Sequence, residues 1–180
     1  FINYAKELHL KEDWETVDLE ESLHLIKVFY ERNKNKFNMH SKTEQKLTAD
    51  INGLKFLGFA DRIDFSPQGL EIIDYKTGSS IISPKNRNWQ LGFYALAAEK
   101  LGKVKKITLD MLKYEKPLEF TVDENGNTKA LNSERMEFNI KEVKEELITE
   151  ANKVLEAYKT GFKPCPMEKN CEFCEEYFYK

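Results

Sequence analysis

Three residues in the middle of the chain carry side chains that could hold a divalent cation and act beside it. Asp61 is followed by Asp74 and, two positions after that, by Lys76. Carboxylate oxygens and a backbone carbonyl such as that of Tyr75 suit Mg²⁺ or Mn²⁺, which take further ligands from water and phosphate. Water on such an ion is deprotonated more easily and could attack phosphorus, with Lys76 positioning it or stabilising charge on the phosphoryl oxygens. These residue types therefore predict metal-dependent phosphodiester hydrolysis if the fold brings them together.

Two turns are expected to place these residues on adjacent strands. Asn52-Gly53 separates the strand-like runs 44–51 and 54–65, and this dipeptide is the strongest short signal for a hairpin. Ser66 to Gly69 separates the second run from a third, 70–76, and again has the composition of a turn. The sequence thus predicts three consecutive antiparallel strands.

The register of these hairpins puts three carboxylates in one row. Counting outward from the turns places Glu44 opposite Asp61 and Asp61 opposite Asp74, with neighbours roughly 4.5–5.5 Å apart. Lys76 points to the same face as Asp74, because side chains alternate along a strand. Carboxylates on an apolar face are desolvated and repel one another, which a cation would relieve. The apolar residues expected on that face are Leu57, Phe59, Ile63, Phe65, Leu70 and Ile72.

An alternative for each of these residues is a solvated surface charge. An Asp-x-Lys sequence at the end of a strand is common, and exposed ion pairs contribute little to stability. Glu44 has the weakest case, because its face of the first strand also carries Lys46, Thr48 and Asp50. That face is equally well explained as an exposed one.

The flanking segments predict helices and further strands around the hairpins. Apolar residues recur at helical spacing from Asp18 to Arg32, and the helix near the middle of the chain is stopped by Gly102. The predicted fold class is an α/β core with a mixed central sheet, antiparallel hairpins and flanking helices. The expected helices are 18–32, 88–101 and 140–158, and the additional strands are 107–114 and 118–122.

Composition restricts the class of protein. The 180 residues are 41% hydrophobic and 33% charged, which is typical of one folded domain. The net charge of −3 disfavours a protein held on nucleic acid by bulk charge alone. We find no run long enough to span a membrane and no signal peptide. The three cysteines all follow residue 164 and form no disulfide framework, so we expect a cytoplasmic protein.

An ordered set of motifs in this chain resembles the RecB-like branch of the PD-(D/E)XK nuclease superfamily. The set comprises Gly58-Phe59-Ala60-Asp61-Arg62-Ile63-Asp64, then Ile72-Ile73-Asp74-Tyr75-Lys76-Thr77-Gly78, then Gln90-Leu91 and Tyr94. Relatives include the nuclease domains of the RecB and AddB helicase–nucleases and the CRISPR-associated RecB-like exonucleases. The resemblance implies a restriction-endonuclease-like fold and a DNA nuclease with Mg²⁺ or Mn²⁺ as cofactor.

The same resemblance assigns roles to individual residues. Asp61 and Asp74 would be metal ligands, Lys76 the catalytic lysine and Glu44 the upstream acidic residue. Gln90 and Tyr94 would form a helix motif beside the site, since residues four apart share one helical face. For Tyr94, packing in the core is an equally good explanation, whereas Gln90 is a polar residue on that stripe. Lys85 and Arg87, just before the expected helix, could contact backbone phosphates or simply lie in a solvated loop.

Two features of the family are matched only in part. Relatives often carry an upstream metal-binding histidine, and His24 is the candidate here, with ordinary packing or solvation as the alternative. Relatives also often end in an iron–sulfur staple, which Cys171 and Cys174 resemble. Adding Cys165 gives three thiolates, whereas a cluster or a structural zinc site usually has four ligands, so we expect an incomplete staple.

The sequence therefore predicts a nuclease, with two alternatives from other classes. The leading hypothesis is an exonuclease that acts on DNA in recombination, repair or defence. The alternatives are a non-catalytic module that binds nucleic acid and an assembly domain of a larger helicase complex. We expect one domain over 1–180, divided into a helical part (1–43), a catalytic core (44–122) and a C-terminal helix with the cysteine tail (123–180).

Overall fold

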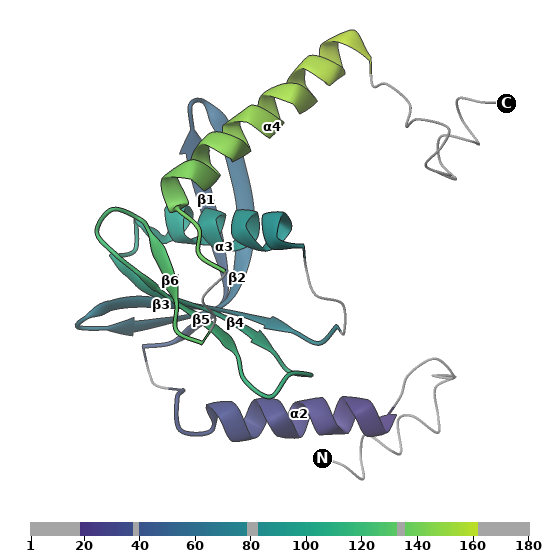
Figure 1. Cartoon of the computed structure of the whole chain (residues 1–180), viewed down its shortest axis with the longest axis vertical. Helices are drawn as coiled ribbons and strands as arrows, with labels where there is room; N and C mark the ends of the chain where they lie inside the picture. The colour runs from purple at the N-terminus through teal and green to yellow at the C-terminus, as the bar shows by residue number, and fades with distance from the viewer. Residues whose placement is uncertain (1–18, 38–39, 79–82, 133–135, 162–180) are drawn as a thin grey trace, which may run out of the picture.

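A mixed sheet of six strands organises residues 19–37, 40–78, 83–132 and 136–161, which are the residues that the computed structural model describes. The strands lie in the order β1-β2-β3-β4-β5-β6, and only the β3–β4 pairing is parallel among these strands. Helices flank this sheet (Figure 1), so the predicted α/β fold class is confirmed. The elements are α2 (Leu19–Asn33), β1 (Lys42–Ile51), β2 (Leu54–Ser66), β3 (Gly69–Lys76), α3 (Pro84–Ala98), β4 (Val104–Met111), β5 (Leu118–Val122), β6 (Thr128–Ala130) and α4 (Ile140–Thr160).

The two hairpins have the register that their turns predict. Asn52 and Gly53 both have positive φ, 54° and 79°, as a two-residue type I′ turn requires, and Ile51 pairs with Leu54. The second turn pairs Phe65 with Leu70. The predicted register is therefore confirmed wherever the ladders are formed.

The helix α3 connects the parallel strands β3 and β4, as a parallel pairing requires. It begins at Pro84, and the Ser83 hydroxyl oxygen caps it by accepting a hydrogen bond from the Asn86 N–H at 3.3 Å. The expected start at Asn88 was therefore wrong, because a serine followed by proline at the first helical position is itself a start signal. The following strand is also displaced toward the N-terminus, to Val104–Met111, and the short strand β6 was not expected.

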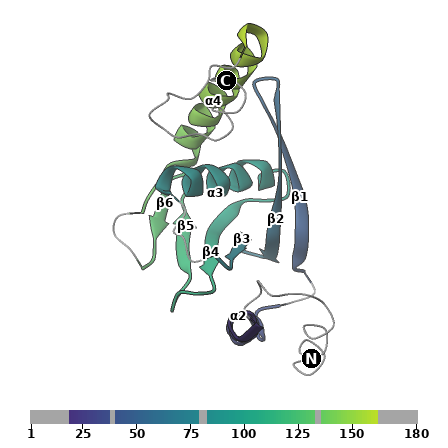
Figure 2. The same ribbon diagram turned by 90° about the vertical axis from the view of Figure 1, so that its right-hand side faces the viewer.

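The helices form two layers on opposite sides of the sheet. Helices α3 and α4 lie together on one side and α2 lies on the other, while the β1–β2 hairpin extends past α3 (Figures 1 and 2). The hydrophobic core is on the α3 side, where residues such as Ile63, Ile72 and Ile107 have no exposed surface. Among the described residues, no helix is long and apolar enough to span a membrane.

Polar contacts, rather than an apolar seam alone, attach α2 to its side of the sheet. The Arg32 guanidinium lies 2.5 Å from the Asp110 carboxylate on β4, and it also donates to the backbone carbonyl oxygens of Tyr114 and Glu115. The Phe29 ring packs edge-on against Tyr75 of β3, with 4.9 Å between centroids. These contacts fix the C-terminal half of α2 beneath the ends of β3 and β4.

Asp61 marks a point where the alternation of side chains along β2 shifts by one position. Before it, Gly58 and Ala60 face α3: a Cβ on Gly58 would lie 2.6 Å from an aromatic ring of that helix, and Ala60 is fully buried. After it, Ile63 faces the α3 core, whereas Arg62 is bonded to α2. The even-numbered residues thus change faces between positions 60 and 62.

This shift corrects the predicted apolar face around Asp61. Leu57 and Phe59 were expected on it, but they are 58% and 50% exposed and lie on the opposite side of the hairpin from α3. The partner strand is irregular at the same place, because Glu44 has a φ of 49° and is skipped by the ladder between Thr43 and Gln45. The other expected members, Ile63, Phe65, Leu70 and Ile72, do pack in or against the core.

Candidate functional site

Three elements bring the candidate residues together at the C-terminal end of β3. Asp74 and Lys76 come from the last residues of that strand, Asp61 from the irregular point of β2, and Gln90 from the first half of α3. The printed ladder between β2 and β3 ends at the pair Arg62–Ile73, so Asp61 and Asp74 lie just beyond it.

Asp74 is the most buried carboxylate of the site, with 2% of its surface exposed. Its Oδ1 accepts a hydrogen bond from the Gln90 amide at 3.2 Å. The Lys76 ammonium lies 2.7 Å from Oδ2 and forms an ion pair with it, but Oδ2 accepts no hydrogen bond of good geometry from the described residues. One oxygen of a buried carboxylate therefore retains capacity for another ligand.

The environment of Asp74 opposes its ionisation. Burial is the largest effect and raises the pKa of this carboxyl above its ordinary value of 3.8. The ion pair with Lys76 lowers the pKa, whereas the nearby charge of Asp61 raises it. An additional positive charge at this position would stabilise the ionised form.

Asp61 is tied to the neighbouring strand through the backbone. Its Oδ2 accepts a 2.6 Å hydrogen bond from the N–H of Tyr75, the residue between Asp74 and Lys76. The Asp61 carboxylate thus takes the place of a ladder bond where the two strands stop pairing. This contact also places the Tyr75 backbone, whose carbonyl is a predicted ligand, directly beside both carboxylates.

Gln90 and Tyr94 lie on the same face of α3, as their spacing predicts. The Gln90 amide nitrogen donates to Asp74 and also to the Tyr94 hydroxyl oxygen, at 3.0 Å. Tyr94 is only 6% exposed and belongs to the hydrophobic core. It therefore supports Gln90 from within the core and presents little surface to a nucleic acid.

Glu44 lies near the two aspartates, because its charge, like theirs, raises the pKa of Tyr94, for which burial is the largest cause. Its side chain is exposed, and its backbone lies in the left-handed region at the irregular point of β1. Among the described residues, no cluster of three or more His, Cys, Asp and Glu side chains could hold a metal ion. Asp61 and Asp74 are therefore the two carboxylates that are hydrogen-bonded into the site, with the exposed Glu44 nearby.

His24 lies on the other side of the sheet from this pair. It is an exposed residue of α2, the helix that contacts Tyr75 and Asp110, whereas Asp74 faces α3. The structure therefore gives no support to His24 as a ligand of the same cation.

The predicted phosphate contacts differ in their surroundings. Lys85 is exposed, lies 3.6 Å from Glu150 of α4 and stacks its ammonium 4.4 Å from the centre of the Trp89 ring. Arg87 is in the first turn of α3 and only 5% exposed, so of the two alternatives considered for it, the solvated loop is excluded. Its guanidinium donates to the Asn88 side-chain oxygen, and burial lowers its pKa. The three predicted cluster ligands, Cys165, Cys171 and Cys174, lie outside the described residues.

The donor set fits a divalent cation of the Mg²⁺ type. Such ions are held by one or two carboxylates and keep several positions for water and phosphate, so a third carboxylate is not required. The carboxylates of Asp61 and Asp74 supply those ligands, and the Asp74 oxygen without a hydrogen bond is available to one. Two carboxylates and one ammonium leave a net negative charge, which would repel a phosphodiester unless a cation were present.

Sequence analysis missed two residues that the fold places behind this site. Arg62 and Asn33 are 0% and 3% exposed, and they are hydrogen-bonded to each other and to the Tyr75 hydroxyl. Arg62 stands between two acidic residues within a strand, a pattern that does not distinguish a buried arginine from a solvated one. Asn33 had no signal beyond its position at the end of a helix.

Comparison with known proteins gives one extensive match. A family model described as "PD-(D/E)XK nuclease superfamily" matches residues 2–176. Among solved structures, the crystal structure of SSO0001 is similar over 65% of this chain and 62% of that chain, with 18% identical residues and a TM-score of 0.37. No curated protein matches the sequence.

Proposed function

Because the chain belongs to the PD-(D/E)XK nuclease superfamily, we propose that it is a DNA nuclease of the RecB-like branch that requires Mg²⁺ or Mn²⁺. The observation that carries the proposal is the arrangement around Asp74, a buried carboxylate held by Gln90 and Lys76 next to Asp61. A purely structural role would not require a charged carboxylate to be desolvated in this way.

The residues of the site divide the work of hydrolysis. Asp61 and Asp74 would hold the cation, with the Tyr75 carbonyl as a further ligand. A bound cation neutralises phosphate charge and makes water a stronger nucleophile near neutral pH. Gln90 fixes the orientation of Asp74 through the 3.2 Å bond to Oδ1.

Lys76 has a second task beyond its ion pair. The Lys76 side chain is 29% exposed, so it can face a substrate while its ammonium remains 2.7 Å from Asp74. A positive charge there would stabilise the charge that builds on the phosphoryl oxygens or orient the attacking water. The proposed substrate is DNA, which the chain would cleave as an exonuclease in recombination, repair or defence. The proposed location is the cytoplasm. Association with a helicase module belongs to the same proposal.

Cleavage of end-labelled single- and double-stranded DNA in Mg²⁺ and in Mn²⁺ tests this function. The native chain is compared with Asp74→Ala and Lys76→Ala, and with Lys153→Ala as a control in which a surface lysine of α4 is lost. We expect metal-dependent cleavage by the native and control chains and a loss of at least about 100-fold in both site variants.

Circular DNA separates the finer possibilities. An exonuclease leaves closed circular DNA intact. Cleavage of circular single-stranded DNA would therefore show that the chain is an endonuclease and not an exonuclease. DNA binding without cleavage in either metal, by a chain that is folded by circular dichroism, would favour the non-catalytic module. Equal cleavage by the native chain and Asp74→Ala would overturn the assigned site.

A further inference from the structure

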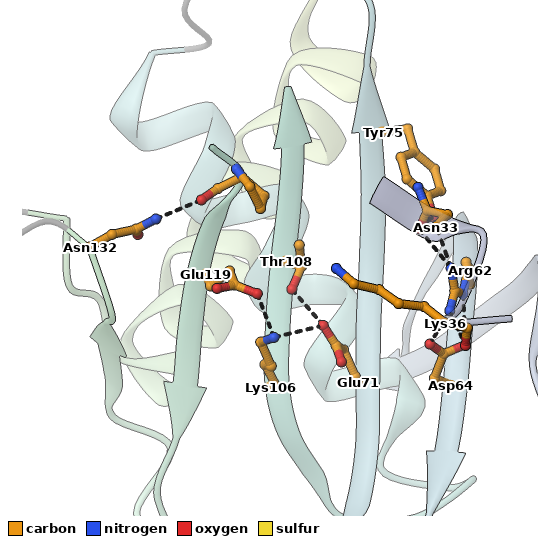
Figure 3. A network of polar contacts seen from close by, with 11 residues as sticks. Asn33, Lys36, Arg62, Asp64, Glu71, Tyr75, Lys106, Thr108, Glu119 and Asn132 are labelled. Atoms are coloured by element: carbon orange, nitrogen blue, oxygen red, sulfur yellow. Dashed lines mark hydrogen bonds and ion pairs between the residues drawn. The ribbon is translucent and has the colours of Figure 1, made fainter. Parts of the chain in front are cut away.

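The strands that carry the two aspartates are joined on the far side of the sheet by a buried hydrogen-bonded group. We define this group as the α2 bridge, formed by Asn33, Arg62 and Tyr75. Figure 3 shows the three side chains together, with Asn33 entering from the helix and the other two from β2 and β3. From this geometry we infer that the α2 bridge positions Asp61 and Asp74 and thereby sets their affinity for a divalent cation, an inference that rests on the proposed function.

The bonds of the bridge converge on one oxygen. The Asn33 Oδ1 accepts from Arg62 Nη1 at 2.9 Å and from the Tyr75 hydroxyl at 3.1 Å, and Arg62 also donates to the Tyr75 hydroxyl oxygen at 3.3 Å. The Asn33 amide nitrogen donates to the Phe29 carbonyl within α2 at 2.8 Å, which fixes the side chain. A single helix residue thus holds one side chain from each of the two strands.

The bridge is held in place because Asn33 and Arg62 are buried, Tyr75 is half-buried, and each is bonded at more than one point. Arg62 is completely buried, and its guanidinium makes two bonds to Asp64, at 2.7 and 2.5 Å, and one to the Lys36 carbonyl at 3.0 Å. Bidentate pairs between arginine and a carboxylate have a fixed geometry. The position of Asn33 relative to β2 is therefore determined through Arg62.

The place of the bridge along the strands gives it a direct effect on the site. Arg62 is adjacent to Asp61, and Tyr75 lies between Asp74 and Lys76. Adjacent side chains in a strand point to opposite faces, so a bond behind the sheet fixes the backbone from which the carboxylate in front projects. The β2–β3 ladder ends at Arg62–Ile73, so the bridge and the bond from Tyr75 N–H to Asp61 hold the strands where the ladder does not.

Residues that orient metal ligands without contacting the metal usually matter for the site. Their removal lowers metal affinity or activity by about 10–100-fold. The side chains of the bridge touch neither the substrate nor the expected cation, so their role is one of positioning. The inference therefore predicts a weaker affinity for metal in a protein that remains folded.

Calorimetric titration with Mn²⁺ tests the inference without relying on DNA cleavage. The chains compared are the native protein, Tyr75→Phe, which removes only the bridging hydroxyl, and Asn33→Ala. Both variants should bind Mn²⁺ roughly 10-fold more weakly or worse. The double variant should be no more than slightly weaker than Asn33→Ala, because the two changes remove a shared bond.

Thr108→Val supplies a matched control. Thr108 is buried on the same face of the sheet, and its hydroxyl donates to Glu71 at 2.7 Å, which joins β4 to β3 outside the α2 bridge (Figure 3). This variant should lose stability with unchanged Mn²⁺ affinity. If Thr108→Val weakens Mn²⁺ binding as much as Tyr75→Phe does, the effect is one of general stability and the inference fails.

Cleavage measured on the same proteins distinguishes failure of the inference from failure of the proposed function. If the native chain cleaves DNA and Tyr75→Phe binds Mn²⁺ as tightly as the native chain does, the proposed nuclease function stands and the positioning role is overturned. If the variants weaken Mn²⁺ binding but the native chain cleaves no DNA, the positioning role stands and the nuclease is overturned. If the positioning role and the nuclease function are both correct, the variants should need more Mg²⁺ for half-maximal cleavage, and their KM for DNA should be unchanged.

Discussion

The Asp61 carboxylate accepts a 2.6 Å hydrogen bond from the backbone N–H of Tyr75 at the point where β2 and β3 cease to pair. A side chain proposed as a metal ligand thus also replaces a backbone ladder bond. The consequence is that the two strands are held at a fixed separation by the residues of the site itself. Changes near this contact should therefore alter function through geometry as well as through charge.

Gln90→Met should reduce metal-dependent cleavage by roughly 10–100-fold, because it removes the amide that orients Asp74. The lost bond also leaves Asp74 Oδ1 buried without its donor, which disfavours the ionised form. Tyr94→Phe is the matched control, since it removes only the hydroxyl oxygen that accepts from Gln90. A steady-state assay in which Tyr94→Phe lost more activity than Gln90→Met would reverse the assigned roles.

The stability of the metal-free protein should depend on pH through Asp74. Burial raises the pKa of this carboxyl above 3.8, so the folded chain binds the proton more tightly than the unfolded chain does. The associated stabilisation is complete below the unfolded pKa and is lost as pH rises through the folded pKa. Asp74→Asn should therefore gain stability relative to the native chain as pH rises above about 4, the usual pKa of an unfolded aspartate, as measured by urea unfolding. A constant difference over that range would contradict the assignment.

Arg32→Ala should cost about 3–5 kcal/mol in the free energy of unfolding, because it leaves the Asp110 carboxylate, 4% exposed, without its cation. Adding Asp110→Asn should restore part of that loss, since a neutral amide is easier to bury than an unpaired charge. Lys34→Ala, which breaks an exposed pair with Glu31, should leave the unfolding midpoint unchanged. An equal loss in the Arg32 and Lys34 variants would show that the buried pair is not special.

Gly92→Ala should destabilise the fold even though alanine is the better helix former. The added Cβ would lie 2.6 Å from Val143 Cγ1 and 2.9 Å from its Cβ, so α3 and α4 would have to separate. Overpacking of this kind costs about 1–3 kcal/mol, which exceeds the roughly 1 kcal/mol that alanine gains in helix propensity. Gly78→Ala, with no atom within 4 Å of its Cβ, is the control, and thermal unfolding is the measurement. If adding Val143→Ala restores the stability of Gly92→Ala, the clash lies between these two residues. If Gly92→Ala loses no stability, the two helices adapt to the added methyl group.

Local chemistry determined much of this fold. Asn52 and Gly53 adopt positive φ, which few other residues tolerate, and the two-residue turn then fixes every pairing outward along β1 and β2. The second turn does the same for β3, so Asp61 and Asp74 were expected as neighbours from the sequence alone. The spacing of Gln90 and Tyr94 likewise follows from the helical period. The cap at Ser83 and Pro84 was equally local, but it was overlooked.

Tertiary structure alone decided which faces these residues occupy near the site. Counting along a strand assumes unbroken alternation, and the shift at Asp61 with the irregular Glu44 breaks it, which leaves Phe59 and Glu44 exposed. The α2 bridge was equally inaccessible, because it joins Asn33 to side chains far away in sequence and its strength comes from burial. Turns and helical periods act between near neighbours and are visible in the chain. Burial and the meeting of distant polar groups arise only when the helices close on both sides of the sheet.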